Sequence, residues 1–137
     1  MNVLTGFYFE SIRIPVIGQI SAGGPIETLP VIGYRTIRKP THYGASQRYF
    51  ATRIVGESLR DDAIRSGDIA ICRFANSVTN GKLAAVLLNG GVTMKYFYQD
   101  PDGTIWLEGA HPDYPAKSYR PEDVQVQAQV IRIERDL

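Results

Sequence analysis

The stretch 49-YFATRIVGESLRDDAIRSGDIAI-71 determines how the rest of the chain is interpreted. An apolar run rich in β-branched residues ends at Gly56-Glu57-Ser58, a charged turn follows, and a second run begins at Ile69. Runs of this composition between turn residues are typical of β-strands. Ser58 therefore stands where a strand ends, either to begin a helical turn or to present its hydroxyl as a nucleophile.

The local pattern by itself favours the first role for Ser58. The tetrapeptide Ser58-Leu59-Arg60-Asp61 has the spacing of a capping box, with an Asp in place of the usual Glu or Gln. A serine at that position accepts a backbone hydrogen bond and stabilises the turn by about 1 kcal/mol. The sequence thus indicates one short helical turn, over residues 58–65, and no other.

The remainder of the chain is predicted to be mainly β. Asn89-Gly90-Gly91 predicts a hairpin between two strands, because these residues tolerate positive φ. In the last run, valines and an alanine alternate with glutamines from Val124 to Val130, as a half-buried strand requires. The other predicted strands are 14-IPVIGQI, 69-IAICRF, 83-LAAVLL, 92-VTMKYFY and 104-TIWLEG. Residues 1–24 are interpreted as an N-terminal arm and residues 25–137 as one compact domain.

Composition limits the classes of function. A net charge of +1 gives no strong field to attract nucleic acid or an anionic membrane. The densest basic cluster, Arg35, Arg38 and Lys39, is interpreted as a solvated loop. The chain lacks the three helical patterns of a helix-turn-helix, so no DNA-reading module is predicted in it. A binder of single-stranded nucleic acid would need base-stacking aromatics, and the candidates are Tyr8, Tyr34, Tyr43 and Tyr49.

Cysteine and histidine usage points to a cytoplasmic protein without a metal or cofactor. Cys72 is the single cysteine and lies in an apolar run, so it is interpreted as a core residue in a reducing compartment. His42 and His111 are the only histidines, too few for a His-based metal site. No run of about 18 apolar residues is present, so no membrane span is predicted.

A lysine in the strand after the hairpin is the second candidate site residue. Alternation places Thr93, Lys95 and Phe97 on one face of that strand. A lysine on an edge strand commonly extends its amine into water and keeps the edge soluble. With Phe97 on its own face, Lys95 can instead lie against an apolar surface.

Taken together, four segments resemble the LexA and UmuD self-cleaving peptidases, which include the C-terminal domains of phage repressors. The segments are 49-YFATRIVGESL, 64-IRSGDIAI, 78-VTNGKLAAVLLNGGVTMKYF and 129-QVIRIERD. The resemblance implies a LexA/signal-peptidase-like fold of short, highly bent sheets with at most one short helical turn. It implies Ser58 as nucleophile and Lys95, 37 residues later, as general base. Ser21-Ala22-Gly23-Gly24 resembles the family's self-cleavage site, with the cut between Ala22 and Gly23.

The resemblance extends to mechanism and partners. The backbone N–H groups of Glu57 and Ser58 are the expected oxyanion donors. The family implies a homodimer, with 124-VQVQAQVIRI a candidate for part of the interface, and activation by a RecA filament after DNA damage. Three positions depart from the family pattern without removing a catalytic atom: Leu59, Lys82 and His111.

Three functions stay open at this point. The chain can be the regulatory domain of a LexA-type or phage repressor, or a UmuD-like accessory subunit of a lesion-bypass polymerase. A dimerisation module without catalysis is the third alternative. The sequence of the arm, 14-IPVIGQISAGGP, resembles the repressors more closely.

Overall fold

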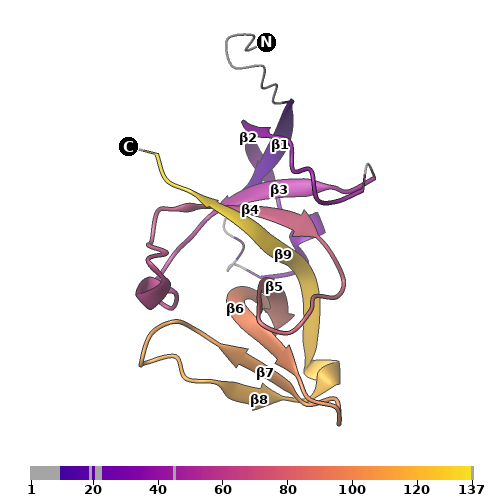
Figure 1. Cartoon of the computed structure of the whole chain (residues 1–137), viewed down its shortest axis with the longest axis vertical. Coiled ribbons are helices and arrows are strands. Elements are labelled where there is room, and N and C mark those ends of the chain that lie inside the picture. Colours follow the sequence, from indigo (N-terminus) through magenta and orange to yellow (C-terminus); the bar gives the residue numbers. More distant parts are fainter. Residues whose placement is uncertain (1–9, 19, 21–22, 45, 137) are drawn as a thin grey trace.

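Nine strands form one continuous mixed sheet in a computed structural model that describes residues 10–18, 20, 23–44 and 46–136 (Figure 1). The order across the sheet is β2-β1-β3-β4-β9-β5-β6-β7-β8. All neighbouring strands are antiparallel except β1 and β3, which are parallel. The strands are β1 (Ser11–Ile17), β2 (Val31–Arg38), β3 (Tyr49–Arg53), β4 (Ile69–Phe74), β5 (Lys82–Leu88), β6 (Gly91–Gln99), β7 (Ile105–Glu108), β8 (Lys117–Tyr119) and β9 (Val124–Glu134).

The longest strand, β9, joins two halves of the sheet. Its C-terminal part pairs with β4 and its N-terminal part with β5, and a β-bulge interrupts each pairing. Bulges bend a sheet and increase its twist. In Figure 1 the strands β1–β4 accordingly lie above and β5–β8 below, with β9 crossing both.

The predicted mainly β fold class is confirmed, and most predicted strands are observed. The described chain contains the 3₁₀ turns Ile26–Thr28, Arg60–Asp62 and Pro121–Asp123, where the sequence indicated a single turn. Proline stands at the N-cap of the first and opens the last, and its fixed φ favours such a turn. β1 lies within the stretch interpreted as an arm and pairs with both β2 and β3.

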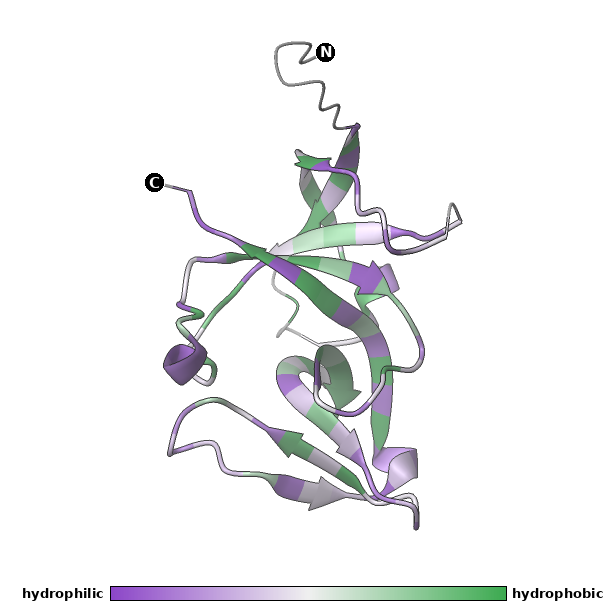
Figure 2. Cartoon of the chain, viewed as in Figure 1, coloured by the Kyte–Doolittle hydropathy of each residue, from purple (hydrophilic) through white to green (hydrophobic). Residues whose placement is uncertain are grey.

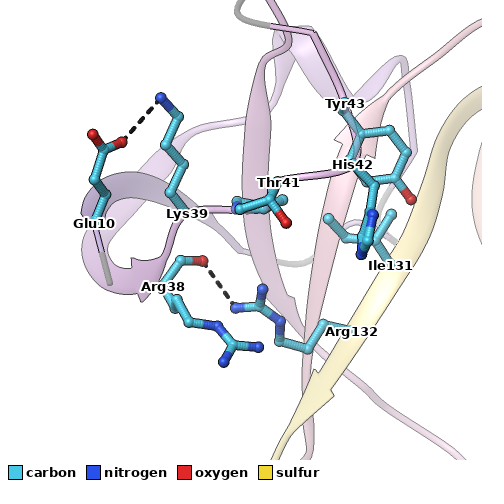
Figure 3. A pocket seen from close by; sticks show the side chains of 9 residues that line it. Glu10, Arg38, Lys39, Thr41, His42, Tyr43, Ile131 and Arg132 are labelled. Carbon is cyan, nitrogen blue, oxygen red and sulfur yellow. Dashed lines mark hydrogen bonds and ion pairs between the residues drawn. The ribbon is translucent and has the colours of Figure 1, made fainter. Parts of the chain in front are cut away.

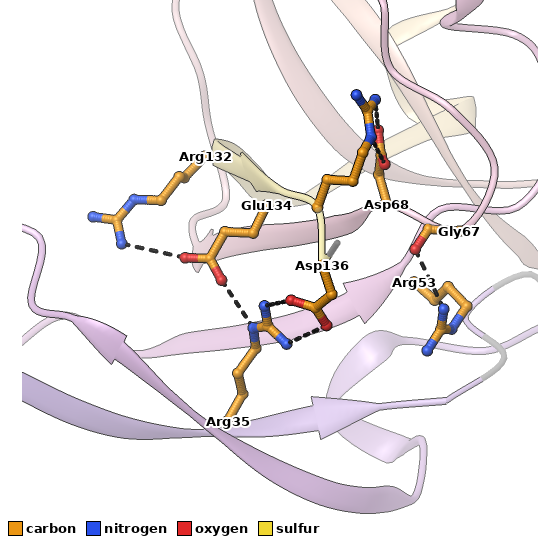
Figure 4. Close-up of polar contacts among 8 residues, drawn as sticks. Arg35, Arg53, Gly67, Asp68, Arg132, Glu134 and Asp136 are labelled. Atoms are coloured by element: carbon orange, nitrogen blue, oxygen red, sulfur yellow. Dashed lines mark hydrogen bonds and ion pairs between the residues drawn. The ribbon is translucent and has the colours of Figure 1, made fainter.

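Two strands, β2 and β8, were not predicted. β2 (VIGYRTIR) is interrupted by Gly33 and two arginines, so it lacks a clear apolar alternation. The interpretation of Arg35, Arg38 and Lys39 as a loop cluster is wrong, because the two arginines lie on β2. Arg35 is ion-paired with Glu134 of β9 at 2.8 Å and with Asp136 at 2.9 Å (Figure 4).

The core follows the alternation of the strands (Figure 2). Val126, Ala128 and Val130 on β9 are buried as predicted, and Cys72 is fully buried. Burial in apolar surroundings raises the pKa of the Cys72 thiol and keeps it protonated. Leu59 and Met94 belong to the same core cluster, the largest one. Leu59 directly follows Ser58, and Met94 directly precedes Lys95. Packing in this cluster therefore fixes the two candidate site residues relative to each other.

Candidate active site

Ser58 and Lys95 are brought together by the fold. Lys95 Nζ lies 3.3 Å from Ser58 Oγ, within hydrogen-bonding distance, although the residues are 37 positions apart. Ser58 lies on a turn that begins after Gly56, whose φ of +95° is accessible mainly to glycine. Lys95 lies in the middle of β6. The structure therefore unites the two residues singled out in the sequence.

The interpretation of Ser58 as a helix cap is wrong. The 3₁₀ turn starts at Arg60, its N-cap is Leu59, and no side chain caps it. The N–H of Asp61, which a capping serine would bind, donates instead to the carbonyl of Ala110 at 2.6 Å. The Ser58 hydroxyl is thus left to face the lysine.

Lys95 is held by three oxygen atoms in a half-buried position. Its Nζ donates to Thr93 Oγ1 at 2.9 Å, to the Met94 carbonyl at 3.3 Å and to Ser58 Oγ. Burial lowers the pKa of Lys95, because desolvation penalises its charged form. A larger fraction of the amine is therefore neutral near pH 7 than for a lysine in water, as a general base requires.

A groove opens beside the lysine. Its volume is about 320 Å³, and it extends from the start of β6 across to β8. Its lining is mixed apolar and aromatic: Leu88, Gly91, Val92, Thr93, Lys95, Leu107, Tyr114, Pro115, Lys117 and Tyr119. A groove of this kind, next to Ser58 and a partly desolvated lysine, can accommodate an extended peptide.

The backbone N–H groups of Glu57 and Ser58 lie at the start of the serine turn. In the part of the chain that the structure describes, neither donates to a backbone or side-chain acceptor. They are available to a developing oxyanion, and their assignment as oxyanion donors stays a prediction.

Of the two residues at the expected cleavage bond, the structure describes Gly23. Ala22 lies outside the described residues. Gly23 adopts φ +115°, and Gly24 donates its N–H to the Gly90 carbonyl at 2.9 Å. The described part of this segment thus contacts the β5–β6 turn. Lys95 lies four residues beyond Gly91, the first residue of β6, which corresponds to about 13 Å along the strand.

A larger hollow, about 490 Å³, contains neither Ser58 nor Lys95 (Figure 3). It is lined by basic side chains and includes the predicted surface histidine His42: Glu10, Arg38, Lys39, Pro40, Thr41, His42, Tyr43, Ile131 and Arg132. His111 is elsewhere, where its Nδ1 accepts a hydrogen bond from the N–H of Asp113. Among the described residues, no group of three or more His, Cys, Asp or Glu side chains could hold a metal ion.

The described residues also contain no helix that is long and apolar enough to cross a membrane.

A family model described as Peptidase S24-like matches residues 15–131, which include both Ser58 and Lys95. The chain belongs to the peptidase S24-like family.

Relatives of this S24-like chain include several LexA repressors. That of Erythrobacter litoralis is 31% identical over 122 residues, covering 88% of this chain and 51% of the repressor. That of Thermotoga maritima is 29% identical over 125 residues, covering 91% of this chain and 63% of the repressor. The repressor of Clostridium tetani is 37% identical over 94 residues, or 68% of this chain and 46% of the repressor. The S24-like chain spans about half the length of the first of these relatives.

Proposed function

We propose that this S24-like chain is the self-cleaving serine–lysine peptidase domain of a LexA-type or phage-repressor-like transcriptional regulator. It would cut its own Ala22–Gly23 bond in the response to DNA damage. The observation that carries the proposal is the 3.3 Å contact between Lys95 Nζ and Ser58 Oγ at a partly desolvated lysine. The LexA repressors among the relatives support a regulator over the alternative of a polymerase accessory subunit.

The dyad supplies a complete acyl-transfer sequence. The neutral Lys95 amine takes the proton of Ser58 Oγ, which attacks the Ala22 carbonyl carbon. The N–H groups of Glu57 and Ser58 stabilise the oxyanion. The C–N bond then breaks, and Lys95 returns the proton to the amine of Gly23. Water, deprotonated by Lys95, hydrolyses the acyl-enzyme and regenerates Ser58.

Access of the arm to the dyad provides the regulation. The groove reaches from Gly91, next to the turn that binds Gly24, to Lys95 itself. We infer that the arm leaves the turn and enters this groove before cleavage. Once docked, it excludes further water from Lys95 and lowers the pKa of the lysine more. A partner that favours the docked state, a RecA filament in this proposal, accelerates cleavage by shifting the population.

Further parts of the proposal concern assembly. The chain would act as a cytoplasmic homodimer, with β9 contributing to the interface, and would reach DNA through a domain outside this chain. The proposed acyl transfer uses neither a metal nor an organic cofactor.

The test is a self-cleavage time course of the purified protein between pH 7 and pH 10, read by intact mass. Fragments 1–22 and 23–137 should appear about tenfold faster per pH unit until Lys95 is neutral, because rate follows the neutral fraction. Ser58→Ala and Lys95→Ala should each abolish them. If the wild-type protein stays intact across this pH range, with and without activated RecA filament, the peptidase proposal is wrong. The alternative of a dimerisation module without catalysis then stands.

A further inference from the structure

The loop that follows β7, residues 109–114, contacts both members of the dyad. Ala110 donates its N–H to the Ser58 carbonyl at 2.6 Å, and its own carbonyl accepts the N–H of Asp61 at 2.6 Å. These two bonds tie the serine turn to the loop on either side of Leu59. The position of Ser58 therefore depends on a segment about 50 residues away in the sequence.

Gly109 is where this approach is closest. A Cβ at this position would lie 2.6 Å from the Ser58 carbonyl oxygen and 2.7 Å from Tyr114 Cβ. Both distances are well inside van der Waals contact. Since Gly109 does not have a positive φ, the position requires glycine for space and not for backbone conformation. Because Gly109 has no side chain, the Ser58 carbonyl and the Tyr114 side chain can both lie close to its backbone.

Tyr114 is the part of the loop that reaches the lysine. Lys95 Nζ lies 5.4 Å from the centroid of its ring. Although Tyr114 is 40% exposed, its backbone is fixed: Gly109 donates to its carbonyl at 3.1 Å, and its N–H donates to the His111 carbonyl at 2.8 Å. The His111 ring packs edge-on against it at 5.7 Å. An exposed aromatic held in this way has a defined position over the groove.

We propose that Tyr114 is a positioning residue that shields Lys95 from water, on a loop that holds Ser58 in line with the lysine. The inference deepens the proposed function and rests on Lys95 being its general base. It assigns a role to a residue that the sequence did not single out.

The sign of the effect follows from two opposing influences of the ring. Covering the amine disfavours its charged form and lowers its pKa, whereas a π-face attracts a cation and raises it. Burial lowers the pKa of Lys95, which is the direction expected where covering outweighs the attraction of the ring face. Lys117 and Tyr119 of β8 are ionisable groups that line the same groove as Lys95, and Glu57 directly precedes Ser58 in the chain. None of them is replaced in the test.

The experiment titrates Lys95 directly by ¹³C NMR of its ε-carbon in the full chain. The chain contains only four lysines, and Lys95→Arg identifies the signal. Every sample carries Ser58→Ala, so no sample cleaves itself at high pH. Tyr114→Ala removes the ring, and Tyr114→Leu keeps an apolar cover without a π-face. Tyr98→Ala is the matched control, because Tyr98 is a similarly exposed tyrosine, 38%, on the strand of Lys95.

Tyr114→Ala should raise the pKa of Lys95 by about one unit. Tyr114→Leu should leave it at or below the Ser58→Ala reference, and Tyr98→Ala should not move it. An unchanged pKa in folded Tyr114→Ala, or a rise in Tyr98→Ala of the same size, overturns the proposal. The readout needs no cleavage, so a silent wild-type enzyme would refute the peptidase activity alone. With Ser58 restored, the pH–rate profile of Tyr114→Ala should shift upward by the same amount.

Discussion

Thr93 Oγ1 lies 2.9 Å from Lys95 Nζ, closer than the Ser58 hydroxyl at 3.3 Å. The two residues are two positions apart on β6, so their side chains leave the same face of the strand. A primary amine on four rotatable bonds has many conformations. The threonine hydroxyl, fixed to a β-branched and therefore stiff side chain, selects the one that faces Ser58.

Replacing Thr93 should therefore slow self-cleavage without removing the dyad. Thr93→Val keeps the shape of the side chain and deletes the hydroxyl, and we expect the rate at pH 8 to fall about tenfold, by loss of one hydrogen bond to a charged or reacting amine. Thr93→Ser keeps the hydroxyl and should retain most of the rate. Equal rates for Thr93→Val and wild type in the intact-mass time course would show that the threonine does not orient the lysine.

The half-buried lysine should lower the stability of the fold at neutral pH. Because the pKa of Lys95 is lower in the folded than in the unfolded chain, the unfolded chain binds the proton more strongly. Stability attributable to this group thus rises with pH, from the lowered pKa up to about 10.4, the ordinary value. Below that window the folded protein carries the full desolvation penalty.

Lys95→Met, compared in a Ser58→Ala background, should relieve this penalty. We expect the free energy of unfolding at pH 7 to rise by about 1 kcal/mol, a size common for single stabilising substitutions. The gain should shrink as the pH approaches 10.4. Urea unfolding at pH 7 and pH 10 measures both values. A variant that is less stable at pH 7 would mean that the three hydrogen bonds of Lys95 outweigh its desolvation.

Gly109 should be intolerant of even one added methyl group. Gly109→Ala must displace either the Ser58 carbonyl or Tyr114, since the new Cβ would lie 2.6 Å and 2.7 Å from them. Overpacking of this kind costs about 1–3 kcal/mol of stability. We expect at least a tenfold loss of self-cleavage beyond what the lower stability explains. Gly44→Ala, at an exposed glycine with open space around it, is the control. An equal loss of self-cleavage in Gly44→Ala would show that the effect is not specific to the contact of Gly109 with Ser58.

The strands could be predicted where the apolar alternation is uninterrupted, as in β6 and β9. β2 could not, because its outward residues Val31, Ile32 and Tyr34 are exposed on an edge strand and its apolar face is short. Its charged Arg35 is explained by the C-terminal end of β9 and the residues after it, which supply Glu134 and Asp136. Such a partner, about 100 positions away, has no local signal in the sequence.

Local pattern alone was misleading at the site itself. The capping-box spacing after Ser58 is real, yet Ala110 takes the N–H that the serine would bind. The pairing of Ser58 with Lys95 came from resemblance to a family, since neither residue is unusual within its own segment. The role of Tyr114 was not predicted, because its approach to Lys95 depends on how tightly Gly109 packs on Ser58.

The turn that carries Ser58 is also anchored at its far end by an ion pair. Arg135 donates from two nitrogens to the Asp68 carboxylate, at 2.7 Å and 2.8 Å, and to the Ala63 carbonyl at 3.0 Å. The Arg135 hydrogen bonds, followed by one from the N–H of Arg65, lower the pKa of Asp68 to about 2. This carboxylate, 3% exposed, is thus stabilised in its charged form.

Acid should therefore destabilise the fold through Asp68, and Arg135→Ala should remove much of this dependence. A depressed carboxyl pKa contributes stability above its unfolded value, about 3.9, and this contribution is lost as the pH falls through about 2. Thermal unfolding in a Ser58→Ala background should show Arg135→Ala melting a few degrees below its parent at pH 6, with the difference vanishing toward pH 2. Arg53→Ala, which loses a 3.3 Å hydrogen bond to the Gly67 carbonyl and a minor electrostatic attraction to Asp136, should show much less convergence. A difference for Arg135→Ala that stays constant from pH 6 to pH 2 would assign its effect to packing and not to the Asp68 charge.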